Sequence, residues 1–161
     1  MDLNKIILRN ELGWEELLGE RFHSIFGLFM GGIEVTQAIQ YFDSAEHLTD
    51  PADRAADNAV RLVALKPAWV RVYVSSLFGA AGLTGTLEVR RRRLGFLWDT
   101  VATLSPDPSS ATSVPALSGT TYATQRGTAG GSLNFIIPAS EMYGTLRLVA
   151  RVTAGSRTAQ S

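Results

Sequence analysis

Four consecutive arginines at residues 90–93 are the strongest chemical signal in this sequence of 161 residues. Guanidinium groups bind phosphates and carboxylates through paired hydrogen bonds, so this run could contact a polyanion or a carbohydrate beside Trp69 or Trp98. Charged residues also occur at sheet edges, where they deter pairing with other chains. We expect these side chains to pair with the acids of residues 1–57 of the same protein, and the alternative is a carbohydrate- or polyanion-binding module that uses Arg90, Arg91, Arg92 and Arg93.

Other reactive residue types are sparse. The chain has no cysteine, which excludes disulfides, thiolate metal sites and cysteine nucleophiles. Its two histidines, His23 and His47, have no recognisable serine partner or zinc-ligand spacing, and we expect both to be solvated. The glycine-rich residues 127–132 precede an expected strand, whereas phosphate-binding loops precede a helix. We therefore expect no catalytic residue, no metal site, no cofactor and no enzymatic activity.

Charge is distributed unevenly along the chain. Residues 1–57 carry eleven acids and four bases, a net charge of −7, and residues 58–161 carry the opposite net charge of +7. The two parts should attract each other within one chain or between chains. The acids of residues 43–57 could also surround calcium, but their spacing matches no EF-hand loop, and we expect a solvated connection at Asp43, Glu46, Asp50, Asp53 and Asp57.

Hydrophobic residues recur with helical spacing between residues 11 and 30. Asn10 is a suitable N-cap, and the pair Gly31 and Gly32 is a suitable stop. Such a helix is marginal alone and needs a surface to cover its apolar stripe. This stripe comprises Trp14, Leu17, Leu18, Phe22, Ile25, Phe26 and Phe29.

Beyond residue 33 the pattern changes to alternation. It predicts strands at residues 33–40, 59–64, 68–76, 83–92, 95–103, 133–137 and 144–153. Residues 105–131 are rich in Ser, Thr, Pro and Gly, and they predict a long loop with a short strand near Thr121 and Tyr122. This series of short alternating strands predicts a mainly β fold, an antiparallel two-sheet β-sandwich with an N-terminal amphipathic helix.

The strand at 68–76 places aromatic and arginine side chains on one side. If it neighbours the strand at 144–153, these side chains would form one interaction face of Trp69, Arg71, Tyr73, Arg147 and Arg151, because aromatic residues and arginine are enriched in protein interfaces. This face could be covered by the helix of the same chain or by a partner protein or second copy.

Three short motifs carry a family resemblance. They are Val35-Thr36-Gln37 in the first strand, the Lys66-Pro67 turn before Val-Arg-Val-Tyr-Val, and the corner Pro138-Ala139-Ser140. With them, residues 33–153 resemble the bacterial immunoglobulin-like β-sandwich domain that precedes the catalytic region in large predicted metallopeptidases and surface proteins. The resemblance implies an accessory module and favours an extracellular location.

These observations predict a helical arm at 1–32, a β-sandwich domain at 33–153 and a tail or linker at 154–161. The expected function is a non-catalytic structural and protein-interaction module of a larger bacterial protein. Its arm would dock on the sandwich, on a neighbouring domain or on another copy in a homo-oligomer. We expect no membrane span, because no run of about 18 apolar residues occurs. Nucleic acid is disfavoured as a partner, because the chain as a whole is not strongly basic.

Overall fold

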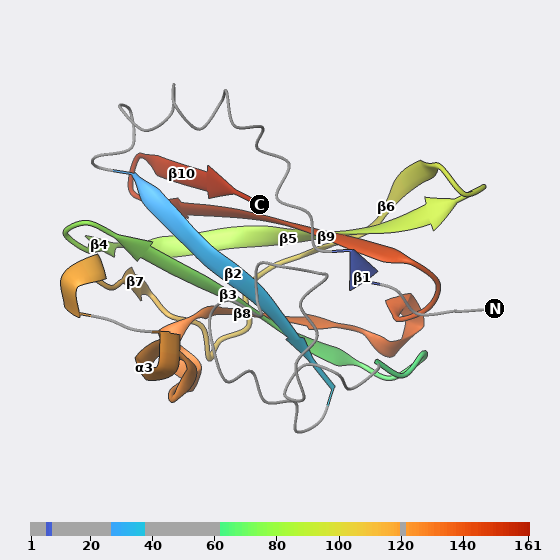
Figure 1. Cartoon of the computed structure of the whole chain (residues 1–161), viewed down its shortest axis with the longest axis horizontal. Coiled ribbons are helices and arrows are strands. Elements are labelled where there is room, and N and C mark those ends of the chain that lie inside the picture. The colour runs from blue at the N-terminus through green and yellow to red at the C-terminus, as the bar shows by residue number, and fades with distance from the viewer. Residues whose placement is uncertain (1–5, 8–26, 38–61, 120–121) are drawn as a thin grey trace.

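The computed structural model of the chain describes residues 6–7, 27–37, 62–119 and 122–161, most of which lie in β-strands (Figure 1). The larger sheet has the strand order β1 (Ile6–Ile7), β9 (Leu146–Ala154), β5 (Leu83–Arg93) and β6 (Leu97–Leu104), and β10 (Arg157–Gln160) also pairs with β9. The pairing of β1 with β9 is parallel, and the other pairings in this sheet are antiparallel.

A second antiparallel sheet has the order β2 (Leu28–Thr36), β3 (Ala68–Ser76) and β8 (Leu133–Ile137). The short strands β4 (Ala80–Ala81) and β7 (Ser113–Val114) form a separate pair. Between β7 and β8 lie one short α-helix, α3, and two 3-10 turns, and a third 3-10 turn follows β8. Their bounds are η2 Leu117–Gly119, α3 Tyr122–Arg126, η3 Ala129–Gly131 and η4 Ala139–Glu141.

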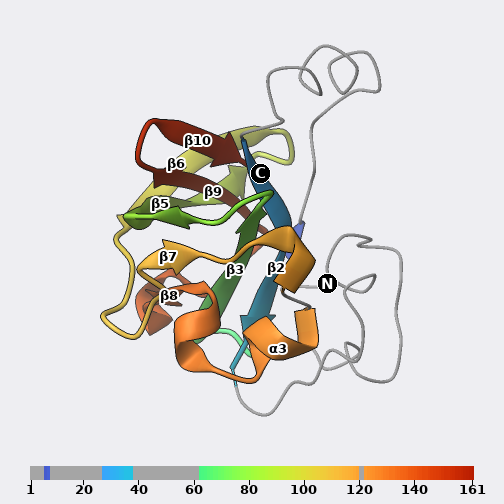
Figure 2. The ribbon, with the colours of Figure 1, turned by 90° about the vertical axis from the view of Figure 1, so that its left-hand side faces the viewer.

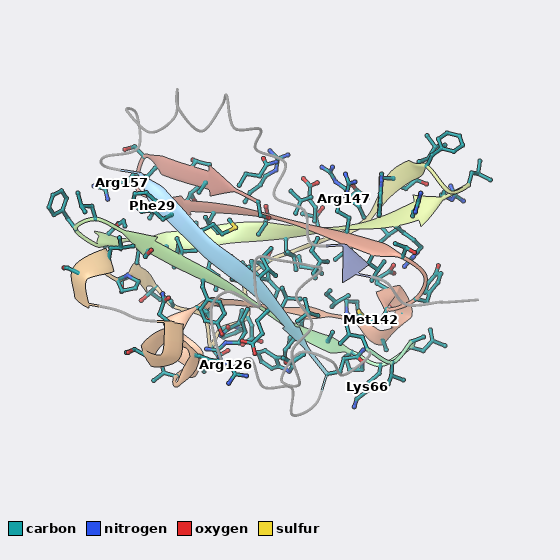
Figure 3. The ribbon with its side chains drawn as sticks, in the orientation of Figure 1. Phe29, Lys66, Arg126, Met142, Arg147 and Arg157 are labelled. Atoms are coloured by element: carbon teal, nitrogen blue, oxygen red, sulfur yellow. The ribbon has the colours of Figure 1, made fainter. Side chains whose placement is uncertain are left out.

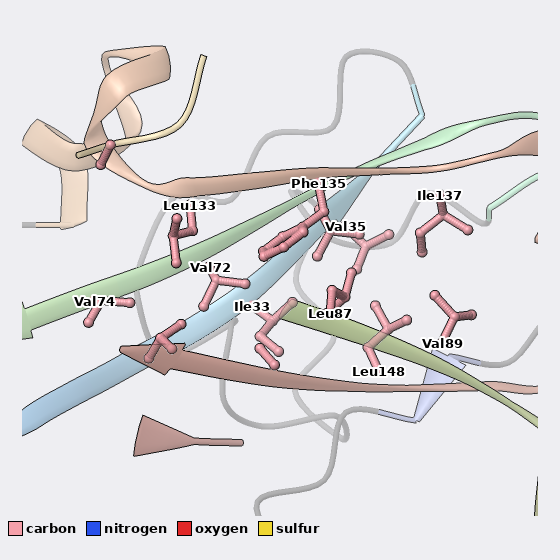
Figure 4. Close-up of a cluster of buried hydrophobic side chains, with 14 of the residues drawn as sticks. Ile33, Val35, Val72, Val74, Leu87, Val89, Leu133, Phe135, Ile137 and Leu148 are labelled. Carbon is pink, nitrogen blue, oxygen red and sulfur yellow. The ribbon is translucent and has the colours of Figure 1, made fainter. Parts of the chain in front are cut away.

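Alternation of side chains explains why the two sheets share a core. In β3, Val70, Val72 and Val74 are buried in the hydrophobic core, while the intervening residues point to the other face of the sheet. Figure 4 shows Ile33 and Phe135 of one sheet opposite Leu87 and Leu148 of the other. Each such fully buried side chain contributes about 2 kcal/mol to folding.

The predicted position at which the N-terminal helix ends is wrong. Leu28, Phe29 and Met30 belong to β2, where they pair with β3, and the register shifts between Met30 and Gly32. The glycine pair therefore accommodates an irregularity within a strand. Glycine is common at such irregularities as well as at the ends of helices. Residues 11–26 of the expected helix, with all of its apolar stripe except Phe29, lie outside the described residues.

Three further expectations are corrected. Residues 157–160 form β10 and bond to β9, so they belong to the larger sheet and not to a linker. Tyr122 begins helix α3 where a short strand was expected. The described residues of the expected strand at 59–64, which are 62–64, are not in a strand, and residues 59–61 lie outside the described part.

Gly85 lies where β5 passes very close to β9. A Cβ atom at this position would lie 2.4 Å from the Arg151 carbonyl oxygen and 3.2 Å from the Val152 Cα atom. We predict that Gly85→Ala lowers the free energy of unfolding by about 1–3 kcal/mol through overpacking, measured by urea denaturation. Gly119→Ala is the control, because nothing lies within 4 Å of its Cβ position. Equal unfolding midpoints for the two variants would contradict this close approach.

Candidate functional site

The outer face of the three-stranded sheet carries a row of polar side chains. Glu34 of β2 is paired with Arg71 of β3, and Arg71 is paired with Asn134 of β8. Glu34 and Asn134 are each only 2% exposed. Buried polar groups need partners, so the contacts of this row determine what it can do.

Two side chains bond to the Glu34 carboxylate, and one of them, Arg126, supplies the opposite charge. The Tyr73 hydroxyl donates a hydrogen bond to one carboxylate oxygen at 2.5 Å. The Arg126 guanidinium, which comes from α3, donates to the other oxygen at 2.9 and 3.2 Å. Glu34 belongs to the acidic part of the chain and Arg126 to the basic part, so this ion pair is an attraction within one chain of the kind that the charge distribution predicts.

Arg71 bonds to the backbone at the end of α3 and just after it. Its guanidinium donates to the carbonyl oxygens of Arg126 at 2.9 Å, Gln125 at 3.1 Å and Thr128 at 2.7 Å, and to the Ser132 hydroxyl at 2.9 Å. Carbonyl groups at a helix C-terminus lack partners within the helix, and a cation satisfies them well. We call Glu34, Arg71, Tyr73 and Arg126 the arginine clamp.

Neighbouring contacts complete the docking of this segment. The Gln125 side-chain amide donates to the Val74 carbonyl at 2.9 Å, and the Asn134 amide donates to the Ala129 carbonyl at 2.8 Å. Gly131 is required here, because a Cβ atom would lie 2.0 Å from the Gln125 carbonyl oxygen. Figure 2 shows α3 beside β2 and β3, and Figure 3 places Arg126 next to this helix.

The expected pairing of the arginine run on β5 with the acids of residues 1–57 is corrected, because within the described residues the run bonds to acids of residues 58–161. Arg90 bonds to Glu88 at 2.6 Å, Arg91 to Glu141 at 2.8 Å, and Arg93 to Asp99 at 2.9 Å. Within the described residues, Arg92 is exposed and makes no ion pair. Polyanion binding by this run stays a prediction.

Two arginines of the larger sheet stack on aromatic rings. The Arg91 guanidinium lies 3.6 Å from the centre of the Tyr143 ring, and that of Arg147 lies 4.3 Å from the centre of the Trp98 ring. Such cation–π contacts fix the direction of a long side chain. Arg91 is therefore held beside Tyr143 on the core side of β5, and Arg147 is held beside Trp98 on the outer face of the larger sheet.

The expected interaction face is corrected, because it does not exist as one surface. Strand β3 pairs with β2 and β8, whereas β9 pairs with β1, β5 and β10, so the two sets of residues lie in different sheets. Arg71 and Tyr73 belong to the arginine clamp. Arg147 stacks on Trp98, and Arg151 lies 3.5 Å from Glu88. Trp69 is 43% exposed beside Ile136 of β8.

A serine-rich turn supports the row at Asn134. The Ser109 hydroxyl and backbone N–H both donate to the Asp107 carboxylate, at 2.6 and 2.9 Å, and these hydrogen bonds hold the pKa of Asp107 below its usual range. The Asp107 N–H donates to the Asn134 carbonyl at 2.7 Å, and the Ser110 hydroxyl accepts from the Asn134 N–H at 2.9 Å. The turn is thereby fastened to β8.

The contacts of the polar row hold α3 and the turn at Asp107 on the outer face of the three-stranded sheet. Within the described ranges, no three His, Cys, Asp or Glu side chains form a group that could hold a metal ion, and no helix there is long and apolar enough to cross a membrane. His23, His47 and the acidic residues 43–57 lie outside those ranges. Sequence reasoning missed Glu34, Arg126 and Asn134, whose roles depend on contacts between distant segments.

Comparison with known proteins found no matching family model, no matching curated protein and no matching solved structure.

We predict that Arg126→Ala destabilises the protein by about 3 kcal/mol, measured by urea denaturation. The substitution leaves the buried Glu34 carboxylate with the Tyr73 hydroxyl but without a cation, and breaking a buried ion pair is costly. Arg93→Ala is the matched control, since its pair with Asp99 is 71% and 45% exposed and should contribute less than about 1 kcal/mol. Similar losses in both variants would contradict a stabilising role for the clamp.

We predict that Ser109→Ala raises the pKa of Asp107 toward its ordinary value, measured by NMR titration of the carboxyl carbon. The depressed pKa means that the ionised group stabilises the fold at neutral pH, and this contribution is lost as the pH falls through the pKa of the folded state. The difference in stability between the parent protein and the variant should therefore shrink in acid. An unchanged Asp107 titration would show that the Ser109 hydroxyl is not its partner in solution.

Proposed function

We propose that this chain is a non-catalytic structural and protein-interaction module of a larger bacterial protein, built as an immunoglobulin-like β-sandwich. The resemblance of residues 33–153 to domains that accompany metallopeptidases supports an accessory role. The arginine clamp supports it as well, because its charged groups are consumed by internal contacts that hold α3 in place. A catalytic group would need access to a substrate, and Glu34 is 2% exposed.

The observation that carries the proposal is an apolar surface at one end of the three-stranded sheet. Trp69 pairs with both Thr36 and Ile136 across the sheet, and Trp69 and Ile136 are 43% and 39% exposed. Trp69 is large and partly rigid, which favours binding because little conformational freedom is lost.

The loop before β3 also exposes apolar side chains. The Gln37 side chain bonds to the backbone of Val63 and to the Lys66 carbonyl, which fixes the loop beside the end of β2. Val63 and Leu65 are 58% and 67% exposed there. We call Trp69 and Ile136 the Trp69 surface, and we propose that it receives either the N-terminal arm or a second copy of the chain.

The double variant Trp69→Gln plus Ile136→Gln tests this proposal in the full chain. If a second copy binds, sedimentation equilibrium should show self-association that the variant weakens roughly tenfold, which corresponds to about 1.4 kcal/mol. If the arm binds, the variant should instead speed limited proteolysis within residues 1–26. Both residues are partly exposed, so the melting temperature should change little.

Phe78→Gln is the control, because Phe78 is 68% exposed on the turn that follows β3. It removes a comparable apolar side chain elsewhere and should leave both measurements unchanged. The proposal fails if the parent protein and the double variant match in both association and proteolysis.

A further inference from the structure

The hairpin that joins β5 to β6 presents apolar side chains to solvent. Leu94 is 83% exposed, Phe96 is 71% exposed and Leu97 is 48% exposed. Figure 1 shows this hairpin at one end of the molecule. It is separate from the Trp69 surface, which lies on the other sheet.

The turn itself is built at a conformational cost. The Phe96 N–H donates to the Arg93 carbonyl at 3.2 Å, and the two residues between them, Leu94 and Gly95, have φ angles of 47° and 81°. Such turns favour Asn or Gly at both central positions, because side chains with a bulky branch are strained there. Leu94 gains no burial in return, so its side chain contributes little to folding.

Basic and aromatic side chains stand directly behind this tip. Arg92 is exposed without an ion pair in the described part of the chain, and Arg93 has a partly solvated pair with Asp99. The Trp98 ring follows and is stacked under Arg147. Along the hairpin, apolar side chains at the tip are followed by arginine and tryptophan. A lipid leaflet has the same sequence of layers, from apolar acyl chains to charged headgroups.

We propose that the β5–β6 hairpin docks on an anionic lipid surface. Leu94, Phe96 and Leu97 enter the outer part of the acyl region, while Arg92 and Arg93 contact lipid phosphates. This mode is association with a membrane surface and needs no spanning segment. The inference goes beyond the proposed function and does not depend on it.

The shape of the tip favours lipid over a protein partner. Stable protein interfaces bury about 800 Å² on each partner and are commonly broad. Three side chains at the tip of a hairpin offer much less, whereas a lipid layer deforms around a projection. The trailing arginines add attraction to an anionic surface, which predicts binding that weakens with salt.

Co-sedimentation with extruded vesicles tests the proposal. The full chain should bind vesicles of phosphatidylcholine with about one quarter phosphatidylserine, and should bind phosphatidylcholine vesicles much more weakly. Leu94→Asn plus Phe96→Thr should reduce binding roughly tenfold or more, because it removes two inserting side chains. Asn suits the positive φ of position 94, so an unchanged melting temperature should confirm that the fold is intact.

Two further variants separate the contributions of charge and of apolar surface. Arg92→Gln should weaken binding to phosphatidylserine vesicles several-fold and reduce its dependence on salt. Phe78→Thr is the control, because Phe78 is 68% exposed on another turn that has no arginine run beside it. That variant should bind as the parent protein does.

Several results would overturn the proposal. One is the absence of sedimentation of the parent protein with phosphatidylserine vesicles, and another is equal binding by the Leu94 and Phe96 double variant. Binding to heparin that the double variant retains, without binding to vesicles, would identify a polyanion site in place of a lipid contact. Loss of self-association in the double variant, again without vesicle binding, would assign the tip to a protein interface.

Discussion

The burial of the Glu34 carboxylate is the constraint on which the outer face of the three-stranded sheet depends. A charge at 2% exposure is costly unless a partner neutralises it, and here the partner comes from α3, far along the chain. Bringing Arg126 to Glu34 brings the end of α3 to Arg71, which then satisfies the carbonyl groups of that segment. One electrostatic requirement thus places a loop that has little hydrophobic content of its own.

The charged side chains of the larger sheet are paired in a different way. Glu88 and Asp99 each accept an arginine near the surface, where an ion pair contributes less than a buried one does. The pair of Arg91 with Glu141 is more buried, at 14% and 25% exposure. Stacking of Arg91 and Arg147 on aromatic rings adds direction to these side chains. The two sheets therefore share a hydrophobic core while their outer faces differ in kind. One face is a buried polar network, and the other is a partly solvated arrangement of arginines.

Alternation made the strands readable from the sequence. Alternation in residues 68–76 puts Val70, Val72 and Val74 on the side opposite the aromatic and arginine side chains, and the structure buries all three in the core. Gly31 and Gly32 led to a wrong prediction for the end of the N-terminal helix. Glycine both ends helices and permits irregular strands, and the local sequence pattern does not distinguish these two roles. No local sequence pattern predicts the arginine clamp. Glu34 and Arg126 are separated by 92 positions, and Arg126 lies in a stretch whose composition indicates a loop.

The expected interaction face needed β3 and β9 to be neighbours, and they lie in different sheets for a related reason. Both strands show the same alternation, and periodicity reports which side of a strand is buried but not which strand lies next to it. The β5–β6 hairpin was easier, because its strands adjoin in sequence. The exposure of its tip is not predicted by the pattern, since Phe96 and Leu97 fall within the expected strand at 95–103 and Leu94 directly precedes it.

Strand β9 pairs with β5 on one side and with β1 and β10 on the other, although it follows nearly all other elements in the chain. A ribosome makes the chain from its N-terminus at about 5–20 residues per second, so β5 emerges several seconds before β9. During that interval β5 is paired with β6 along one edge, and its other edge has no partner strand. Consolidation of this sheet must therefore wait for late synthesis, and the growing chain is open to chaperone binding or to aggregation in the meantime.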